Sequence, residues 1–492
     1  MIGHSIPEYI FIRICIWGLR LVAPLSIAYV ASSWYTGSWI YSRWIGYYAL
    51  IESCFYFFVY LPRSKFLQEA AKHPELLSRK EREALFAKCF ARMSDTDQAT
   101  GWFYPPSPNS IRRENMLEWI LWALFASNRA ERLEEWEDEL EGYIHLVEKL
   151  MGRKLEDGWD EDIKCMKVSM DPIVSLHRPF VWYLIVALVD TYTTVNLVVY
   201  GFQHYTLSRW YTYFPPRLFS PLVKPSPYPQ LSYWYRPHRS KTKQPIVFFH
   251  GIGIGLVPYV PFLAEIAAAD PDVGIIAIEN LSISMRISPE PLTREKMLEA
   301  VRVILDYHSV QTFVVAGHSY GSVTAAHVMR SETLSPRVAG WLFVDPIPFL
   351  LHLPAVAYNF VYRMPKTANE WQLWYFASRD PDIARSLGRH FFWAENILWR
   401  EDLAGRKVGV VLSGRDQIVD AAEVRKYLTG EEEVKFRWKS EDEKLEVLWY
   451  PDLDHSKVFD TTKLRRPMVD ILHEFVKIEE RPESVDEAVL VH

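Results

Sequence analysis

Beyond residue 245, short apolar runs alternate with longer stretches in which polar and apolar positions repeat with helical spacing. Hydrophobic residues occupy successive positions in each short run, which is typical of strands buried on both faces of a parallel sheet. The longer stretches, such as 294–308 and 463–477, have the length of crossover helices. We therefore predict an α/β domain with a mostly parallel sheet, helices on both faces, and strands at 246–249, 273–278, 312–316, 338–344, 407–412 and 445–449.

The first 202 residues contain three apolar stretches. Residues 21–42 carry no charged side chain, residues 44–61 carry only Glu52, and residues 179–202 carry only Asp190. Basic residues flank the first two stretches, at Arg13, Arg20, Arg43, Arg63 and Lys65. Such flanking, combined with many Trp and Tyr residues, is typical of membrane anchoring. We expect one to three membrane-embedded or interfacial helices, and the alternative is a buried helical layer in a soluble protein.

A cleavable signal peptide does not fit the N-terminus, because Arg13 and Arg20 interrupt its apolar part. We expect a membrane-associated protein, with the endoplasmic reticulum as one candidate location and a soluble cytoplasmic protein as the alternative. The four cysteines have neither metal-ligand spacing nor the pattern of a disulfide framework. A reducing compartment is therefore compatible with the chain.

Changes in composition along the chain predict its domain organisation. The proline-rich, basic stretch FPPRLFSPLVKPSPYPQ resists helix formation and is typical of a linker. The predicted segments are membrane-associated helices over 1–66, a mainly helical region over 67–213 with a further apolar helix at about 179–202, a linker over 214–245, the α/β domain over 246–480 with a cap at about 347–405, and an acidic tail over 481–492.

Overall composition narrows the choice of partners. The chain has 492 residues, of which 49% are hydrophobic, and a formal net charge of −6. Because no basic face is evident, nucleic acid is not an expected partner. No motif indicates a metal ion or a cofactor, and the sequence makes no prediction of the oligomeric state.

The motif Gly317-His318-Ser319-Tyr320-Gly321 follows the predicted strand at 312–316 and precedes a plausible helix. In this G-x-S-x-G context the serine occupies a sharp strand-to-helix turn, and the flanking glycines leave room for the bend. A serine hydroxyl is a weak nucleophile and needs a base that is oriented by a third group. Ser319 is the candidate nucleophile, and an ordinary glycine-rich turn is the alternative.

Candidate partners for Ser319 follow two later strands. Asp416 comes after the strand at 407–412, and His455 comes after the strand at 445–449. Because ligands gather at the carboxyl ends of parallel strands, these residues are expected to converge on Ser319. Asp345 and Asp420 compete with Asp416 for the acid position, whereas Asp452 and Asp454 are expected to point elsewhere.

The loop His250-Gly251-Ile252-Gly253-Ile254-Gly255 follows the first predicted strand. Its backbone N–H groups, with that of Tyr320, are candidates for an oxyanion hole. A glycine-rich loop after a strand also occurs in dinucleotide-binding proteins, and in that alternative Glu279 would bind the ribose. The alternative leaves Ser319, Asp416 and His455 unexplained.

Residues 240–480 resemble the α/β-hydrolase superfamily through HGIGIG at 250–255, GHSYGS at 317–322, SGRDQIVD at 413–420 and DLDHSKVF at 453–460. The resemblance implies Ser319 as nucleophile, Asp416 as acid, His455 as base, and the N–H groups of Ile252 and Tyr320 as the oxyanion hole, with Ile252 preferred to Gly253. The interval from Asp416 to His455 is long for this family and contains a charged insertion. The whole chain resembles membrane-anchored fungal hydrolases of unassigned substrate.

Aromatic residues are frequent in the predicted cap, which includes Phe349, Tyr358, Phe360, Tyr362, Trp371, Trp374, Tyr375, Phe376, Phe391, Phe392, Trp393 and Trp399. An aromatic cap above a serine favours an apolar acyl or alkyl substrate. The alternative is that the rings pack the cap on the sheet or on the N-terminal helices. The working hypothesis is a serine hydrolase for a hydrophobic, lipid-like ester, and the alternatives are an acyltransferase with the same triad and a non-catalytic membrane-associated scaffold.

Overall fold

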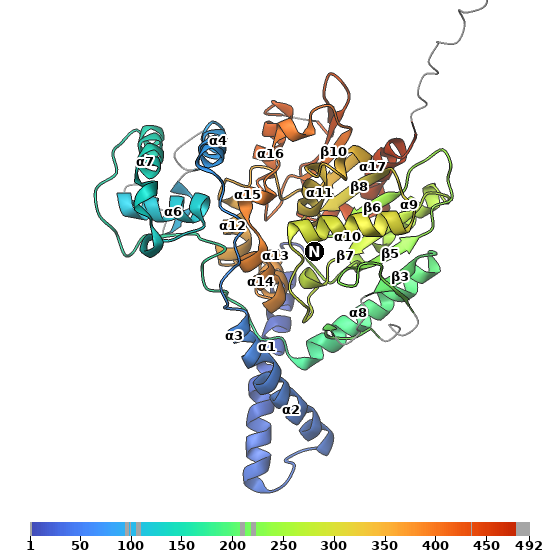
Figure 1. Cartoon of the computed structure of the whole chain (residues 1–492). Coiled ribbons are helices and arrows are strands. Elements are labelled where there is room, and N and C mark those ends of the chain that lie inside the picture. The colour runs from blue at the N-terminus through green and yellow to red at the C-terminus, as the bar shows by residue number, and fades with distance from the viewer. Residues whose placement is uncertain are drawn as a thin grey trace, which may run out of the picture.

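The computed structural model describes residues 2–93, 98, 100–104, 110–206, 212–217, 223–433 and 435–478, and the predicted acidic tail at 481–492 lies outside them. The first part of the described chain is mainly helical (Figure 1). Its elements are α1 (Ile6–Thr36), α2 (Arg43–Phe55), α3 (Leu61–Phe66), α4 (Arg79–Phe90), β1 (Phe103–Tyr104), α6 (Arg113–Phe125), α7 (Glu137–Met151), β2 (Lys164–Cys165) and α8 (Phe180–Val199).

The second part contains the large sheet, its covering helices and the cap. The strands are β3 (Gln203–Thr206), β4 (Lys224–Pro225), β5 (Ser232–Arg236), β6 (Ile246–Phe249), β7 (Ile275–Glu279), β8 (Phe313–His318), β9 (Val338–Val344), β10 (Val408–Ser413), β11 (Arg437–Lys439) and β12 (Leu445–Tyr450). The helices are α9 (Val260–Ala269), α10 (Arg294–Tyr307), α11 (Gly321–Met329), α12 (Ala355–Ala357), α13 (Ala368–Leu373), α14 (Pro381–His390), α15 (Trp393–Asn396), α16 (Ala421–Thr429) and α17 (Thr462–Phe475).

The sheet has the strand order β11-β12-β10-β9-β8-β6-β7-β5-β3-β4. Its six central strands, from β12 to β7 in that order, are parallel, whereas β5 and β11 pair antiparallel with their inner neighbours. These six strands are the six predicted from the apolar runs, which confirms that prediction. The register pairs Phe249 at the end of β6 with Gly317 of β8, so the loops after the two strands begin side by side.

Helices cover both faces of the sheet, which explains why its strands are apolar at successive positions. Val247, Val315 and Val410 pack in one core with α10, α11 and α16. Their sequence neighbours Phe248 and Val314 pack in a second core with α9 and α17. Alternate side chains of each strand therefore enter opposite cores, and each position is removed from water.

The segment at 214–245, predicted as a linker, differs in the structure. Ser232–Arg236 forms β5, paired with β7, and β3 lies just before this segment in the chain. The run Tyr233-Trp234-Tyr235 has the aromatic composition that strands favour. The surrounding proline and basic residues concealed it, so the sheet begins earlier in the chain than predicted.

Helices α1 and α2 project from the body as a hairpin (Figure 1). The N-terminal half of α1 packs on the cap, where Ile12 and Ile16 contact Ala368 and Tyr375. Near the far end of the hairpin, Trp34 is 88% exposed and Tyr35 is 90% exposed. Gly37 ends α1 in the left-handed region, at a φ of 67°, and thereby breaks the uncharged stretch predicted over 21–42.

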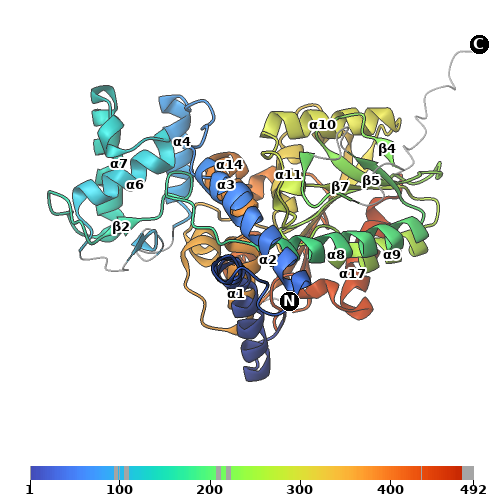
Figure 2. The same ribbon diagram turned by 90° about the horizontal axis from the view of Figure 1, so that it is seen from below.

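The apolar helix α8 lies along the sheet domain beside α9, as Figure 2 shows. One side of α8 is buried, and there the Asp190 carboxylate accepts a hydrogen bond from Arg286 at 2.6 Å. Arg217 also pairs with Asp190 and with Glu279 at the end of β7. The opposite side exposes Leu188, Tyr192, Val195, Val198 and Val199. By length and composition α1, the segment Arg43–Phe66 and α8 could each cross a membrane.

Candidate active site

Ser319 occupies a sharp turn between β8 and α11, as predicted for the G-x-S-x-G motif. Its φ of 51° lies in the left-handed region, which side-chain-bearing residues rarely adopt. A Cβ on Gly317 would lie 2.8 Å from the carbonyl oxygen of Gly321. A Cβ on Gly321 would collide with the carbonyl oxygen of Phe249 at the end of β6. Both glycines are therefore required for the backbone to turn this closely against the neighbouring strand.

Ser319, His455 and Asp416 lie in one hydrogen-bonded chain. The Oγ of Ser319 is 2.8 Å from Nε2 of His455, and Nδ1 of His455 is 2.6 Å from Oδ2 of Asp416. The other carboxylate oxygen of Asp416 accepts hydrogen bonds from the N–H groups of Ile418 and Val419 at 2.7 and 3.0 Å. Asp416 is therefore held by its own loop with one oxygen left for the histidine.

Charge around His455 favours its protonated form. His455 is 5% exposed, and this burial by itself lowers its pKa. The negative charge and hydrogen bond of Asp416, with further negative charge from Asp345 and Asp454, outweigh burial and raise the pKa of His455 to about 9. The pair is thus suited to holding a proton on the imidazole beside a carboxylate.

Asp345, the rival candidate for the acid, lies at the end of β9 and has other partners. Its carboxylate accepts hydrogen bonds from the N–H groups of Ser413 at 3.1 Å and Ser456 at 2.7 Å. It thereby joins the ends of β9 and β10 to the turn after His455. Ligand atoms of Asp345, Asp416 and His455 lie within 4.8 Å of one another, a spacing that could hold a metal ion. Each of these groups already has a protein partner, however, and the hydrogen-bonded chain to Ser319 accounts for the arrangement.

Asp454 neighbours His455 in sequence, but its carboxylate points to the Asp416 loop and the cap rather than to the imidazole. It is buried and accepts hydrogen bonds from the N–H of Gln417 at 3.1 Å and the side-chain amide of Asn369 at 2.6 Å. Asp454 therefore ties the loop of His455 to the loop of Asp416 and to cap helix α13. These contacts are between segments far apart in the chain, and the sequence carried no local signal for them.

The loop after β6 lies directly against the nucleophile. A Cβ on Gly251 would be 2.8 Å from the Cβ of Ser319. The N–H of Gly251 donates to the hydroxyl of Tyr259 at 3.1 Å, and the N–H of Gly253 donates to the carbonyl of Ile283 at 3.1 Å. Ile252, between them, lines the same cavity as Ser319 and Tyr320. The use of the Gly253 N–H elsewhere favours Ile252 over Gly253 as an oxyanion donor.

The dinucleotide alternative does not fit the surroundings of Glu279. Its carboxylate is buried and bound by both terminal nitrogens of Arg217. The charge of Arg217 and hydrogen bonds from His204 and Arg217 overcome the effect of burial and hold the pKa of Glu279 well below its usual range. The carboxylate is therefore committed to an internal ion pair rather than available to a ribose.

A cavity of about 1250 Å³ opens at Ser319. Cap residues Phe360, Phe391 and Trp393 line one side of it, and residues of the N-terminal helical region line another. Other cap aromatics have a packing role: Trp371, Trp374 and Phe376 pack with α1, and Phe376 also contacts α8. The cap aromatics therefore divide into residues that line the cavity and residues that pack on the N-terminal helices.

No protein-family model and no curated protein matches the chain. Among solved structures, the chain is similar to a membrane phospholipase A described as a bacterial virulence factor, with 13% identity and a TM-score of 0.39 over 60% of this chain and 94% of that one. An esterase from Rhodococcus sp. ECU1013 is 17% identical, with a TM-score of 0.34 over 50% and 96% of the two chains. An α/β hydrolase from a Medee basin deep-sea metagenome is 13% identical, with a TM-score of 0.35 over 51% and 98%.

The fold follows from the chain's own topology. The sheet has six central parallel strands, and the turn at Ser319 follows β8. Asp416 follows β10 and His455 follows β12, later in the chain. This is the arrangement in which the G-x-S-x-G motif is found in α/β hydrolases. The predicted fold class is confirmed: the chain has an α/β-hydrolase fold, preceded by a mainly helical region with apolar helices.

Proposed function

We propose that the protein is a serine hydrolase that cleaves an ester of a hydrophobic, lipid-like substrate through an acyl-enzyme. The observation that carries the proposal is the hydrogen-bonded chain from Asp416 through His455 to Ser319, which ends at a large cavity. A nucleophile, a base in reach of its proton and a carboxylate that orients the base are the requirements of this chemistry.

In the proposed reaction, Nε2 of His455 removes the proton from Ser319 as Oγ attacks the ester carbonyl carbon. The imidazolium then gives this proton to the leaving alkoxide oxygen as the bond between that oxygen and the carbonyl carbon breaks, and an alcohol departs. Water repeats the sequence on the acyl-enzyme and releases a carboxylic acid. Asp416 accepts a hydrogen bond from the proton on Nδ1 of His455, which leaves Nε2 free to receive the serine proton. Asp416 also stabilises the imidazolium that forms in both steps.

The oxyanion in this proposal is bound by the N–H groups of Ile252 and Tyr320. Both residues line the cavity beside Ser319, on the two loops that the β6 and β8 register brings together. Such donors act most strongly where the charge develops in the transition state, and losing one costs about 3 kcal/mol in comparable enzymes.

The substrate class is inferred from the cavity and from the apolar helices. A cavity of about 1250 Å³ with aromatic walls is larger than most sites for small polar molecules and suits a long apolar group. The exposed aromatic end of the α1–α2 hairpin suits insertion into a lipid bilayer. Because Asp190 is bound by two arginines of the sheet domain, we infer that α8 lies along the membrane surface rather than across it.

The test uses the full chain in detergent micelles and an alkyl fluorophosphonate, which reacts with activated serines. We expect labelling of Ser319, found by peptide mass spectrometry, and a loss of ester hydrolysis of at least about a thousandfold in Ser319→Ala. Ser331→Ala, beyond the end of α11 and outside the cavity lining, is the control and should keep full activity.

Full hydrolysis by Ser319→Ala would overturn the proposal, and the absence of labelling in folded protein would favour the scaffold alternative. Formation of a new ester when an alcohol competes with water would identify acyl transfer instead.

A further inference from the structure

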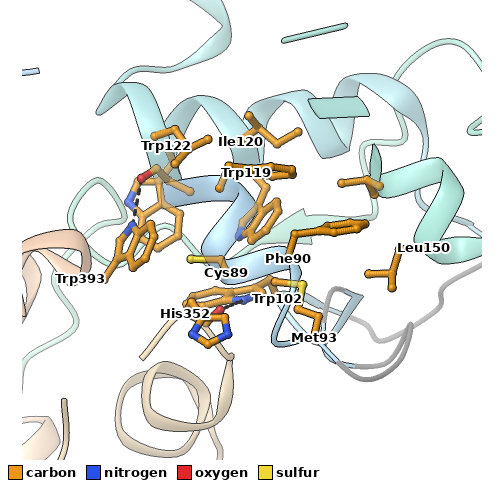
Figure 3. Close-up of a pocket in the computed structure, with 14 residues that line it drawn as sticks. Cys89, Phe90, Met93, Trp102, Trp119, Ile120, Trp122, Leu150, His352 and Trp393 are labelled. Atoms are coloured by element: carbon orange, nitrogen blue, oxygen red, sulfur yellow. Dashed lines mark hydrogen bonds between the residues drawn. The ribbon is translucent and has the colours of Figure 1, made fainter. Parts of the chain in front are cut away.

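A second, smaller cavity of about 40 Å³ lies between the N-terminal helices α4, α6 and α7 and the cap (Figure 3). It adjoins the cavity at Ser319, because Trp102, Trp122 and Trp393 line both. By comparison, an apolar cavity of about 150 Å³ holds a single benzene molecule. The small cavity therefore does not suit a separate ligand, but it can receive the end of a chain that enters from the larger one.

The walls of the small cavity are uncharged. Its lining consists of aromatic and aliphatic side chains with Cys89 and His352. Burial lowers the pKa of His352 to about 4 and raises the pKa of the Cys89 thiol to about 12, so both are neutral near pH 7. Such a cavity is expected to exclude water and ions and to accept hydrocarbon.

Three of the four tryptophans that line this space have their indole N–H groups bound to protein acceptors, whereas the indole N–H of Trp119 is buried without a hydrogen-bond partner among the described residues. The indole N–H of Trp102 donates to the carbonyl of His352 at 3.1 Å, and that of Trp122 donates to the hydroxyl of Ser169 at 3.0 Å. The indole N–H of Trp393 donates to the carbonyl of Ala123 at 3.0 Å. These donors are satisfied within the protein, so their rings can bound the cavity as rigid apolar walls.

The two ends of the small cavity differ in what they adjoin. Trp393, which also lines the cavity at Ser319, lies at one end, and Leu150 on α7 lies at the other end (Figure 3). Leu150 lines only the small cavity, as do Trp119 and Ile120. A chain that starts at Ser319 would therefore pass Trp393 and stop near Leu150.

We propose that the N-terminal helical region binds the terminal methylene and methyl groups of the substrate's acyl chain, and that Leu150 limits its length. The proposal rests on the function proposed for Ser319 and specifies its substrate class as a long-chain fatty acyl ester. It assigns to α4, α6 and α7 a direct part in substrate selection, although they lie outside the α/β-hydrolase fold.

The first test measures kcat/KM for 4-nitrophenyl esters from butyrate to stearate, with the full chain in detergent micelles. Leu150→Trp should leave butyrate hydrolysis unchanged and should lower kcat/KM for the longest esters by about fourfold per excluded methylene. Leu150→Ala should move the preference toward longer chains. Leu146→Trp is the matched control, because Leu146 lies one turn earlier on α7, is also half-buried and does not line the cavity. Identical chain-length profiles in wild type and both Leu150 variants would overturn the proposal.

A second measurement does not require hydrolysis. A fatty acid with a diazirine at its terminal carbon is photolysed with the full chain, and the modified peptides are identified by mass spectrometry. We expect modification within α4, α6 or α7 in wild type and in Ser319→Ala, and its loss in Leu150→Trp. Modification elsewhere, combined with Ser319-dependent hydrolysis, would refute the chain-end site alone. Modification at the expected helices without hydrolysis of any ester would refute only the function proposed for Ser319.

Discussion

The hydroxyl of Tyr259 lies 2.7 Å from Nδ1 of His318, the residue before the nucleophile. The same hydroxyl accepts the N–H of Gly251 in the candidate oxyanion loop. The Tyr259 oxygen can accept from Gly251 while its own proton is donated to Nδ1 of His318, and this pairing suits the histidine tautomer with its proton on Nε2, 3.7 Å from Asp345. Tyr259 therefore fixes the loop of Ile252 to the strand that carries Ser319.

Removal of this hydroxyl should affect the rate more than substrate binding. In Tyr259→Phe the N–H of Gly251 loses its acceptor, and the oxyanion donors beside it lose their exact placement. We expect kcat to fall about tenfold or more with little change in KM, and stability to fall by about 1–3 kcal/mol. Steady-state kinetics and thermal unfolding measure the two effects.

Tyr233→Phe is the matched control, because Tyr233 is buried in β5 and its hydroxyl lies 3.0 Å from His308, on the opposite side of the sheet from α9. It should lose stability but keep kcat. A rise in KM alone in Tyr259→Phe would contradict a positioning role for this tyrosine.

The two buried carboxylates near His455 should differ in importance. Asp416→Asn leaves an amide against Nδ1 and favours the wrong imidazole tautomer, so we expect kcat to fall by about 10⁴-fold. Asp345→Asn keeps an acceptor for Ser413 or Ser456 and leaves Asp416 in place, so the loss should be at least a hundredfold smaller. Kinetics of both variants decide the assignment. Equal losses, or a larger loss in Asp345→Asn, would make Asp345 the acid.

The sheet could be predicted from sequence because each of its six parallel strands has a local signature. Burial on both faces demands apolar residues at successive positions, and such runs are visible without tertiary information. The nucleophile turn is also marked by a local motif, although only Gly317 is required by a neighbour within five residues, the carbonyl of Gly321, whereas Gly321 is required by the close approach of Phe249 on β6. Candidates for the acid and the base could then be sought among residues that directly follow later strands, such as Asp416 and His455.

What the sequence missed depends on contacts between distant segments. The strands β3 and β5 lie in or beside a stretch rich in proline and basic residues, and their role is evident only from the pairing of β5 with β7 and of β3 with β5. Tyr259 and Asp454 act through partners 59 and 85 residues away, His318 and Asn369. Aromatic cap residues also look alike in sequence, although Phe391 faces the cavity and Trp371 faces α1.

The rate should depend on pH through His455. Ser319 can transfer its proton only to neutral imidazole, and the pKa of His455 is raised to about 9 by Asp416, Asp345 and Asp454 against the effect of burial. We therefore expect kcat/KM to rise about tenfold per pH unit below 9 and to level off above it. In Asp345→Asn the inflection should move to lower pH, because one negative charge is lost. A wild-type profile that is flat from pH 6 to 9 would contradict this assignment of charge.

Membrane binding should depend on the end of the α1–α2 hairpin rather than on the catalytic domain. Trp34 and Tyr35 are 88% and 90% exposed, and each aromatic ring buried in lipid contributes about 1.5–3 kcal/mol. Trp34→Glu combined with Tyr35→Glu should weaken co-sedimentation with phosphatidylcholine vesicles by at least about a hundredfold.

Fluorophosphonate labelling of Ser319 in detergent should stay unchanged, because the hairpin end lies far from the cavity lining. Tyr307→Glu, an exposed aromatic on α10, is the control and should bind vesicles as wild type does. Equal binding by the hairpin variant and the control would show that the hairpin is not the membrane anchor.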